Sequence, residues 1–355
     1  MRGAELFSSP EDELPRLWQK PAYEVLLETL KKLRVEPRVW SLQDSRADIL
    51  KEQAATAYDR REVVAFLSSI IKSGLPWLDS DDEREVIWEE ASKRMSERCG
   101  RTAMGEITRR WPFEDHGHGA FSLVIREPPL TGDSLGLKTW GSSYALARLL
   151  RQFADGPLAH LFVPGVLSAP HEVLELGSGT GLLGLAAACV WKMSVMLTDL
   201  PTIIPNLAHN VSLNREVVGR LGGKAEAAPL TWGGSREDVD PIFWEPNRFQ
   251  LIIVADPLYD DDHPTLLAGA IDEQLALGAD ARVLAMVPQR DEITRGLLSS
   301  LREELGRRPR PLLCLEEGVV DGQDDWGDEH GGDDDDGMRN VGFWWGIFGR
   351  APSSC

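Results

Sequence analysis

Residues 173–188 read VLELGSGTGLLGLAAA, an apolar strand that runs into four glycines and then into small helix-forming residues. A strand joined to a helix by a short turn is the opening unit of a parallel α/β sheet, in which ligands lie beyond the carboxyl ends of the strands. Gly177 and Gly179 permit backbone angles and close approach that a β-carbon would block. The stretch therefore predicts an α/β fold with a small-molecule site at this turn.

The rest of the chain supports that fold class by its regular alternation of strands and helices. From Glu172 onward the segments predicted as strands are EVLELG, SVMLTD, KAEAAPLTW, FQLIIVADPLY, ARVLAMVPQ, RPLLCLEEG and GFWWGIFGR, and helical segments separate the first six. Such alternation predicts right-handed crossovers and helices on both faces of the sheet. No helix separates the last two strands, so we expect an antiparallel terminal hairpin.

The predicted domain organisation has three parts. Residues 1–110 contain amphipathic segments and form a helical N-terminal region, whereas 111–350 form the α/β domain. A leading hairpin is expected at the start of that domain, with AFSLVIREPPL pairing with SLGLKTWGS through a turn at PPLTGD. Residues 321–337 hold nine carboxylates and no Lys or Arg, which predicts a flexible acidic insertion between the last two strands.

Charge and cysteine content limit the partners and the compartment. The formal net charge is −19, which disfavours a nucleic acid or a membrane surface as partner. The four cysteines form no CxxC pair, and the N-terminus lacks the apolar core of a secretion signal. We therefore expect a cytoplasmic protein. His116 and His118 have no third ligand nearby in sequence, so no metal site is predicted.

Two acidic residues bear on the ligand of the glycine turn. Gly179, Gly181 and Gly184 also fit the dinucleotide pattern GxGxxG, and Asp199 follows at the distance of a ribose-binding acid in either case. Glu175 would repel a pyrophosphate but suits an amino-acid moiety and ribose hydroxyls. This favours S-adenosylmethionine over a nicotinamide dinucleotide, although a dehydrogenase remains an alternative.

A second motif is expected at the same edge of the sheet. The strand IIVA ends in Asp256, Pro257, Leu258 and Tyr259, so a carboxylate and an aromatic ring follow its carboxyl end. This quartet differs by one residue from the Asp-Pro-Pro-Tyr motif of amino-group methyltransferases that act on flipped bases. The acidity of the chain and the lack of a basic cluster argue against a nucleic acid acceptor.

The combination of TWGSSYALA, VLELGSGTGLLGLAAA, LTDLPTIIPNLAHNVSLN, PLTWG and IIVADPLY resembles the seven-β-strand protein-lysine methyltransferases called methyltransferase family 16. The resemblance covers about residues 121–350. It implies a Rossmann-like methyltransferase fold, S-adenosyl-L-methionine as cofactor and a protein substrate. The helical N-terminal segment is similar to the branch that methylates elongation factor 2, and the family implies a monomer.

Carried over residue by residue, the resemblance implies a cofactor site and an acceptor site. The cofactor would be lined by Trp140, Glu175, Gly177, Gly179, Asp199 and Trp232. Asp256 and Tyr259 would be the acceptor-side pair, in which Asp256 binds and orients the lysine. The alternatives are a small-molecule or nucleic-acid methyltransferase, and a non-catalytic cofactor-binding adaptor.

Overall fold

The structure is a computed structural model that describes residues 14–34, 62–98, 106–114, 119–129, 135–163, 165, 173–324 and 339–350. The chain divides into two compact units, the first made chiefly of residues up to Ile107 and the second chiefly of Thr108–Pro128 and Asp133–Cys355. The predicted boundary after residue 110 falls inside a strand, Ile107–Phe113. No helix of the described residues is long and apolar enough to cross a membrane.

The first unit is helical, as its amphipathic segments predict. It contains η2 (Leu17–Gln19), α1 (Tyr23–Lys32), a helix over 62–72 and α3 (Asp81–Ser96). Ser80 caps α3 by accepting a hydrogen bond from the backbone N–H of Glu83. Leu26, Leu67 and Ile87, one from each long helix, are fully buried together in one apolar cluster. This unit therefore has a core of its own.

The second unit is built on a seven-stranded sheet. In chain order its strands and α-helices are β1 (Ile107–Phe113), β2 (Phe121–Glu127), α4 (Gly141–Asp155), β3 (Val173–Leu176), α5 (Leu182–Trp191), β4 (Ser194–Asp199), α6 (Ile204–Arg220), β5 (Lys224–Pro229), β6 (Leu251–Ala255), α7 (His263–Gln274), β7 (Arg282–Pro288), α8 (Glu292–Arg307), β8 (Leu312–Asp324) and β9 (Arg339–Arg350). Short 3-10 turns η3 (Leu135–Leu137), η4 (Ala159–Phe162), η5 (Arg236–Asp238) and η6 (Pro241–Phe243) lie between them. The sheet order is β5-β4-β3-β6-β7-β9-β8.

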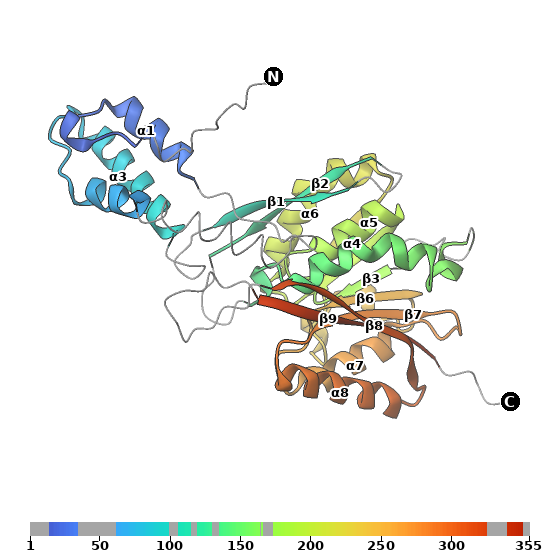
Figure 1. The fold of residues 1–355 in the computed structure, drawn as a ribbon. Coiled ribbons are helices and arrows are strands. Elements are labelled where there is room, and N and C mark those ends of the chain that lie inside the picture. Colours follow the sequence, from blue (N-terminus) through green and yellow to red (C-terminus); the bar gives the residue numbers. More distant parts are fainter. Residues whose placement is uncertain are drawn as a thin grey trace, which may run out of the picture. The chain divides into compact units, whose positions relative to one another are not determined.

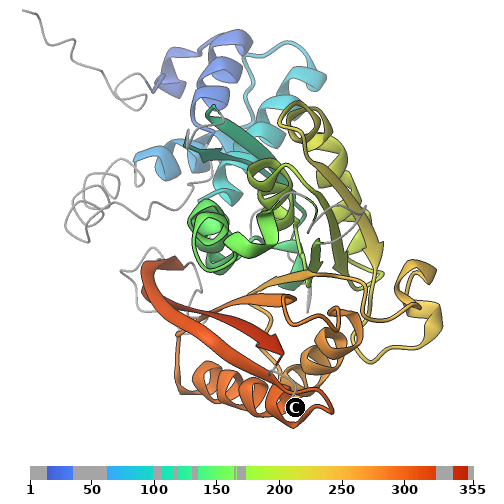
Figure 2. The ribbon, with the colours of Figure 1, turned by 90° about the vertical axis from the view of Figure 1, so that its right-hand side faces the viewer.

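Helices cover both faces of this sheet, which confirms the predicted fold class. Helices α4, α5 and α6 lie on one face, and α7 and α8 lie on the other (Figure 1; Figure 2). The residues of β3 and β6 are buried throughout because both faces of each strand are covered. Strand order reverses between β3 and β6, so the carboxyl ends of these two strands flank the expected ligand crevice.

The terminal hairpin is also confirmed. β9 runs antiparallel to both β7 and β8, and every other pairing in the sheet is parallel. Residues 321–324 of the predicted acidic insertion belong to β8, whereas 325–338 lie outside the described residues. At the carboxyl edge, the N–H of Gln289 donates a hydrogen bond to the carbonyl of Gly342, so β9 begins beside the end of β7.

The leading strand pair was predicted with the wrong partner. β2 pairs with β1, and the segment expected as its partner forms η3 and the start of α4 instead. Pro112 inside β1 disguised that strand, because a proline within an apolar run argues against a strand in sequence. In the structure Pro112 is exposed, and the buried positions of β1 alternate around it, with Trp111 fully buried.

An asparagine ladder, formed by the buried residues Asn206, Asn210 and Asn214 of α6, holds β2. The Asn214 side-chain amide accepts from the N–H of Val124 (2.8 Å) and donates to its carbonyl (2.7 Å). Asn210 does the same with Arg126, at 2.9 and 3.0 Å, and also donates to the carbonyl of Thr180 in the glycine turn (2.9 Å). The ladder therefore supplies the hydrogen bonds that a neighbouring strand would make.

Candidate active site

The glycine turn lies between β3 and α5, where the sequence places it. Gly177 (φ +68°) and Gly179 (φ +55°) both adopt left-handed backbone conformations. A β-carbon on Gly179 would lie 3.1 Å from the carbonyl oxygen of Gly136. Ser178 ties the turn to β4, because it exchanges two hydrogen bonds with the backbone of Thr198. The turn is thus a narrow, backbone-lined cradle.

Asp199 ends β4 and faces this turn. One of its carboxylate oxygens accepts the N–H of Gly179 (2.7 Å) and the other accepts the N–H of Leu200 (2.7 Å). Burial raises the pKa of this carboxyl, and the two N–H groups partly oppose the effect. Each oxygen keeps a second lone pair, so Asp199 can also accept hydrogen bonds from ligand hydroxyls.

Glu175 lies beneath the turn rather than at its rim. Its side chain on β3 points toward α5, where a β-carbon on Gly184 would lie 2.4 Å from Oε2. Oε2 is buried and has no hydrogen-bond partner. Burial raises the pKa of Glu175 to about 8, although Ser178 and the N–H of Gly184 stabilise its charged form. The predicted cofactor residue is therefore a buried acid that has no cationic partner among the residues that the structure describes.

Trp232 forms the wall opposite the turn. It follows β5, and its ring lies 3.2 Å from the position of a β-carbon on Gly177. His263, the first residue of α7, stands edge-on to the Trp232 ring at a centroid distance of 6.0 Å. The structure thus brings together five of the six predicted cofactor residues: Glu175, Gly177, Gly179, Asp199 and Trp232.

Asp256 and Tyr259 follow β6 at the same edge. Asp256 has a left-handed backbone conformation (φ +54°), which aspartate adopts more readily than most residues. Its N–H donates to the carbonyl of Met286 in β7 (2.9 Å). Tyr259 is half exposed and stands edge-on to His263 at 4.2 Å. Burial raises the pKa of Tyr259, and the charges of Asp199 and Asp256 raise it further. The glycine-turn acid and the acceptor-side acid therefore both act on one phenol.

Sequence reasoning missed the partner of Asp256. Arg290, two residues after β7, makes a bidentate ion pair with the carboxylate: Nη1 donates to Oδ1 at 2.9 Å, and Nη2 donates to Oδ2. The two side chains are only 8% and 4% exposed. The position of Arg290 after a buried strand next to β6 was a usable signal, because neighbouring parallel strands end at the same edge.

Trp140 lies on this acceptor side. Its ring Nε1 donates to the carbonyl of Leu135 (3.1 Å), and the guanidinium of Arg290 lies 5.4 Å from its ring centroid. Leu135, Trp140, Asp256, Tyr259 and Arg290 line one hollow of about 200 Å³. We call it the acceptor hollow. Thr139, the residue before Trp140, joins this hollow to the turn by a hydroxyl contact with Thr180 (2.8 Å).

The residues at the turn fit S-adenosylmethionine. The cradle is lined by backbone where β-carbons would intrude, Asp199 can accept from ribose hydroxyls, and buried Glu175 has an unpartnered oxygen. Glu175 is largely protonated near pH 7, since its pKa is about 8, and a ligand that carries positive charge would stabilise its ionised form, whereas a pyrophosphate would oppose ionisation. Gly177, Gly179, Asp199 and Trp232 would hold the cofactor directly, with Glu175 below them.

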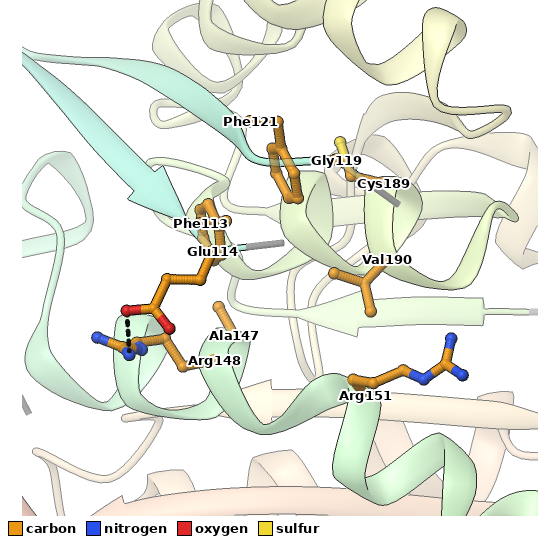
Figure 3. A pocket seen from close by; sticks show the side chains of 9 residues that line it. All are labelled: Phe113, Glu114, Gly119, Phe121, Ala147, Arg148, Arg151, Cys189 and Val190. Atoms are coloured by element: carbon orange, nitrogen blue, oxygen red, sulfur yellow. Dashed lines mark hydrogen bonds and ion pairs between the residues drawn. The ribbon is translucent and has the colours of Figure 1, made fainter. Parts of the chain in front are cut away.

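A larger hollow, of about 490 Å³, lies elsewhere on the second unit (Figure 3). The stacked rings of Phe113 and Phe121 (4.8 Å) form one side, and an ion pair between Arg148 and Glu114 (3.5 Å) lies at another. It reaches α5 at Cys189, seven residues beyond the glycine-turn end of that helix, or about 10 Å along its axis. The methyltransferase residues do not line it.

In the described part of the chain, no group of three or more His, Cys, Asp or Glu side chains is placed so that it could hold a metal ion. His116 and His118 lie outside the described residues.

The sheet order with its reversed terminal hairpin, the glycine cradle at the switch point and the acid at the end of β4 define a class I methyltransferase fold. Residues 122–304 match the lysine methyltransferase family, and the chain belongs to that family.

Curated relatives carry the same description. The protein-lysine N-methyltransferase EFM2 of Saccharomyces cerevisiae is 35% identical over 68% of this chain and 58% of its own length. The protein-lysine N-methyltransferase rrg1 of Schizosaccharomyces pombe is 28% identical over 79% of this chain and 83% of its own. The EEF1A lysine methyltransferase 3 of Mus musculus is 33% identical over only 28% of this chain and 38% of its own. The chain thus spans less than two thirds of EFM2.

Proposed function

We propose that this protein transfers a methyl group from S-adenosylmethionine to a lysine side chain of a protein, with elongation factor 2 as the first acceptor to test. The observation that carries the proposal is the position of His263, whose ring packs edge-on against Trp232 at the glycine turn (6.0 Å) and against Tyr259 at the acceptor hollow (4.2 Å). The cradle for the cofactor and the hollow for the acceptor are therefore adjacent. Membership of the lysine methyltransferase family supports lysine as the acceptor residue.

The protein's main task in this reaction is alignment. The bound cofactor supplies a methyl group on a sulfonium sulfur, which is open to in-line attack by an amine. Asp256 and Tyr259 orient the amine at the mouth of the acceptor hollow, and Trp140 forms its wall. Holding an amine in a near-attack position converts a bimolecular step into an effectively unimolecular one.

The amine must also be neutral when it reacts. A free lysine has a pKa of about 10.4, so only about one in a thousand is uncharged near pH 7. We assign no general base, because water can take the proton before the amine enters the hollow. Desolvation in the hollow then favours the neutral form.

The acceptor is proposed to be a cytoplasmic protein. The relatives that cover most of this chain are protein-lysine methyltransferases. Elongation factor 2 is proposed as the acceptor on the resemblance of the N-terminal sequence to the branch that modifies it. A net charge of −19 also favours a basic protein surface over a phosphate backbone. We expect the enzyme to act as a monomer.

The test is transfer of a radiolabelled methyl group from S-adenosylmethionine into an extract of cells that lack this protein. Wild type is compared with Asp256→Ala and with Asp261→Ala, an exposed carboxylate of the same loop that serves as the matched control. A discrete labelled protein containing methyl-lysine, lost only with Asp256→Ala, is expected. Label confined to nucleic acid or small molecules would indicate another methyltransferase class, and cofactor binding without transfer would indicate an adaptor.

A further inference from the structure

The charge of Asp256 raises a difficulty for the proposed reaction. A buried carboxylate without a counter-ion would attract a lysine as the ammonium and hold it in that form, because an opposite charge within a few ångströms favours the charged state. The ammonium has no lone pair and cannot attack a methyl group. An acceptor hollow with one uncompensated carboxylate would therefore bind lysine well and use it poorly.

The structure resolves this difficulty through Arg290. Both guanidinium nitrogens of its fork contact Asp256, and both side chains are at least nine-tenths buried. The Trp140 ring also packs against the Arg290 guanidinium, whose central carbon lies 5.4 Å from the ring centroid. Arg290 is therefore held on two sides, by a carboxylate and by an aromatic face, and it is always protonated.

Other charged and titratable groups around the acceptor hollow come from the segment before α4, the loop after β6 and the start of α7. Lys138, which is almost fully buried before α4, lies 4.3 Å from the centroid of the Trp140 ring. Tyr259 lies in the loop after β6, and His263 begins α7. The imidazole Nδ1 of His263 donates to the carbonyl of Pro257 (2.9 Å).

Three further carboxylates lie close to these groups. Asp199 from β4 and Asp260 from the loop after β6 act on the Tyr259 phenol. Asp291 follows Arg290, but its side chain caps α8 by accepting from the N–H and hydroxyl of Thr294. Arg290 is the group that meets Asp256 in a buried, bidentate contact.

Displacement of Arg290 by the incoming lysine is the competing possibility. It would exchange a bidentate guanidinium for a single ammonium, and it would leave Arg290 as a buried charge without its carboxylate. Nothing in the geometry favours that exchange. With Arg290 in place, Asp256 still has lone pairs that can accept a hydrogen bond from a neutral amine.

We propose, on the basis of the function proposed above, that Arg290 is a positioning residue that balances the charge of Asp256, so that the acceptor hollow receives lysine as a neutral amine. Asp256 then orients the amine by accepting one of its N–H groups. The selectivity of the hollow for the uncharged form is a property of the Asp256 and Arg290 pair rather than of either residue alone.

The first experiment measures binding of n-butylamine, a mimic of the lysine side chain, by NMR titration of the protein loaded with S-adenosylhomocysteine. The neutral fraction of such an amine rises about tenfold per pH unit below its pKa. The apparent affinity of wild type should therefore rise about tenfold per unit between pH 7 and pH 9. Arg290→Gln should bind the ammonium, so its affinity should be nearly constant over this range.

Three further variants separate charge from structure. Arg290→Lys keeps the charge and should keep the steep dependence on pH. Asp256→Asn combined with Arg290→Gln removes both charges, so it should restore the steep pH dependence that Arg290→Gln alone loses. Arg295→Gln, at an exposed arginine of α8, is the matched control and should equal wild type. A flat pH dependence or no binding in wild type, or an equally steep dependence in Arg290→Gln, overturns the proposal.

The second experiment follows methyl transfer to unmethylated elongation factor 2 as a function of pH. In Arg290→Gln the rising limb of kcat/KM should move to higher pH by about one unit or more, and Arg290→Lys should reverse the shift. Equal loss at every pH would mean a structural role and contradict the proposal. If wild type binds butylamine as expected but methylates no protein, the proposed function fails while the assignment of Arg290 stands.

Discussion

The two halves of the site treat their buried carboxylates in opposite ways. At the glycine turn, Glu175 is buried, Asp199 is half-buried and both have raised pKa values, and no salt bridge joins either of them to a cation within the described residues. On the acceptor side, Asp256 is also buried but is joined to Arg290 by two hydrogen bonds. One half has unbalanced acidity, and the other is neutral as a pair.

This difference matches the charges of the two substrates. Acids without counter-ions can ionise when a cation binds beside them, which suits a cofactor with a net positive charge. A balanced pair gives no such advantage to an ammonium and so permits a neutral amine to bind. The comparison teaches that burial alone does not define the role of an acid; its counter-ion does.

The largest expected effect comes from closing the glycine turn. Gly179→Arg should reduce S-adenosylmethionine affinity by more than about 100-fold, because Gly179 is left-handed and its β-carbon would press on the carbonyl of Gly136. Isothermal titration measures the loss. Gly278→Arg, at an exposed glycine with open space around it, is the control. Normal cofactor binding by Gly179→Arg would show that the turn is not the cradle.

Removing Asp256 from its pair with Arg290 should abolish methyl transfer and lower the free energy of unfolding. Asp256→Ala leaves Arg290 buried without its partner, which costs about 3–5 kcal/mol of stability for a pair of this kind. Cofactor affinity should stay within about fivefold of wild type, a change worth about 1 kcal/mol, because the cradle is untouched. Urea unfolding and titration calorimetry measure both quantities. An equal loss of cofactor binding and transfer would contradict the division into two halves.

Glu175, the buried acid beneath the glycine turn, should make the free energy of unfolding depend on pH. The pKa of Glu175 is about 8 in the folded chain, against 4.5 for an ordinary glutamate, so the folded state binds the extra proton between these values. The free energy of unfolding should therefore fall as pH rises through this window, by up to about 1.4 kcal/mol per unit.

Glu175→Gln cannot ionise and should lack this contribution. Urea unfolding of the cofactor-free protein at pH 6, 7 and 8 should show a shallower decline in the variant. The exposed substitution Glu216→Gln serves as the control. Identical slopes for Glu175→Gln and wild type would indicate that Glu175 is ionised throughout.

The smallest expected effect is at the residue between the halves. Tyr259→Phe keeps the ring but loses the hydroxyl, so transfer should fall about fivefold, the value of one hydrogen bond of about 1 kcal/mol. Initial rates at saturating cofactor measure it. Cofactor affinity should not change, and a larger fall in affinity than in rate would place Tyr259 in the cofactor half.

Much of this fold could be predicted because the signals were local. The strand–turn–helix unit at the glycine turn, the alternating elements and the antiparallel terminal hairpin follow from patterns in neighbouring residues, and all three were confirmed. The strand pair was predicted wrongly because Pro112 makes β1 look unlike a strand in the sequence, and because β1 and β2 pair only with each other, outside the seven-stranded sheet. Patterns in sequence report a residue's own element better than its partners.

Side-chain pairing in the site was harder to predict for the same reason. Asp256 and Arg290 are 34 residues apart and meet only because β6 and β7 are neighbours. The resemblance placed Trp140 with the cofactor residues, whereas the described contacts place it in the acceptor hollow. Glu175 lies on the predicted strand, but its side chain points beneath the turn, toward Gly184 of α5. Alternation along a strand predicts which face of the sheet a side chain occupies, but not which residues it contacts there.

The asparagine ladder works as a ruler. Four residues of helix advance about 6 Å and two residues of strand advance about 6.6 Å, so Asn210 and Asn214 meet Arg126 and Val124 with almost no mismatch. A slip of β2 by one residue would present the amides to groups that point the other way. Asn210 also donates to the carbonyl of Thr180, so the same side chain is bonded to β2 and to the glycine turn. A shift of either segment would therefore strain the hydrogen bonds to the other.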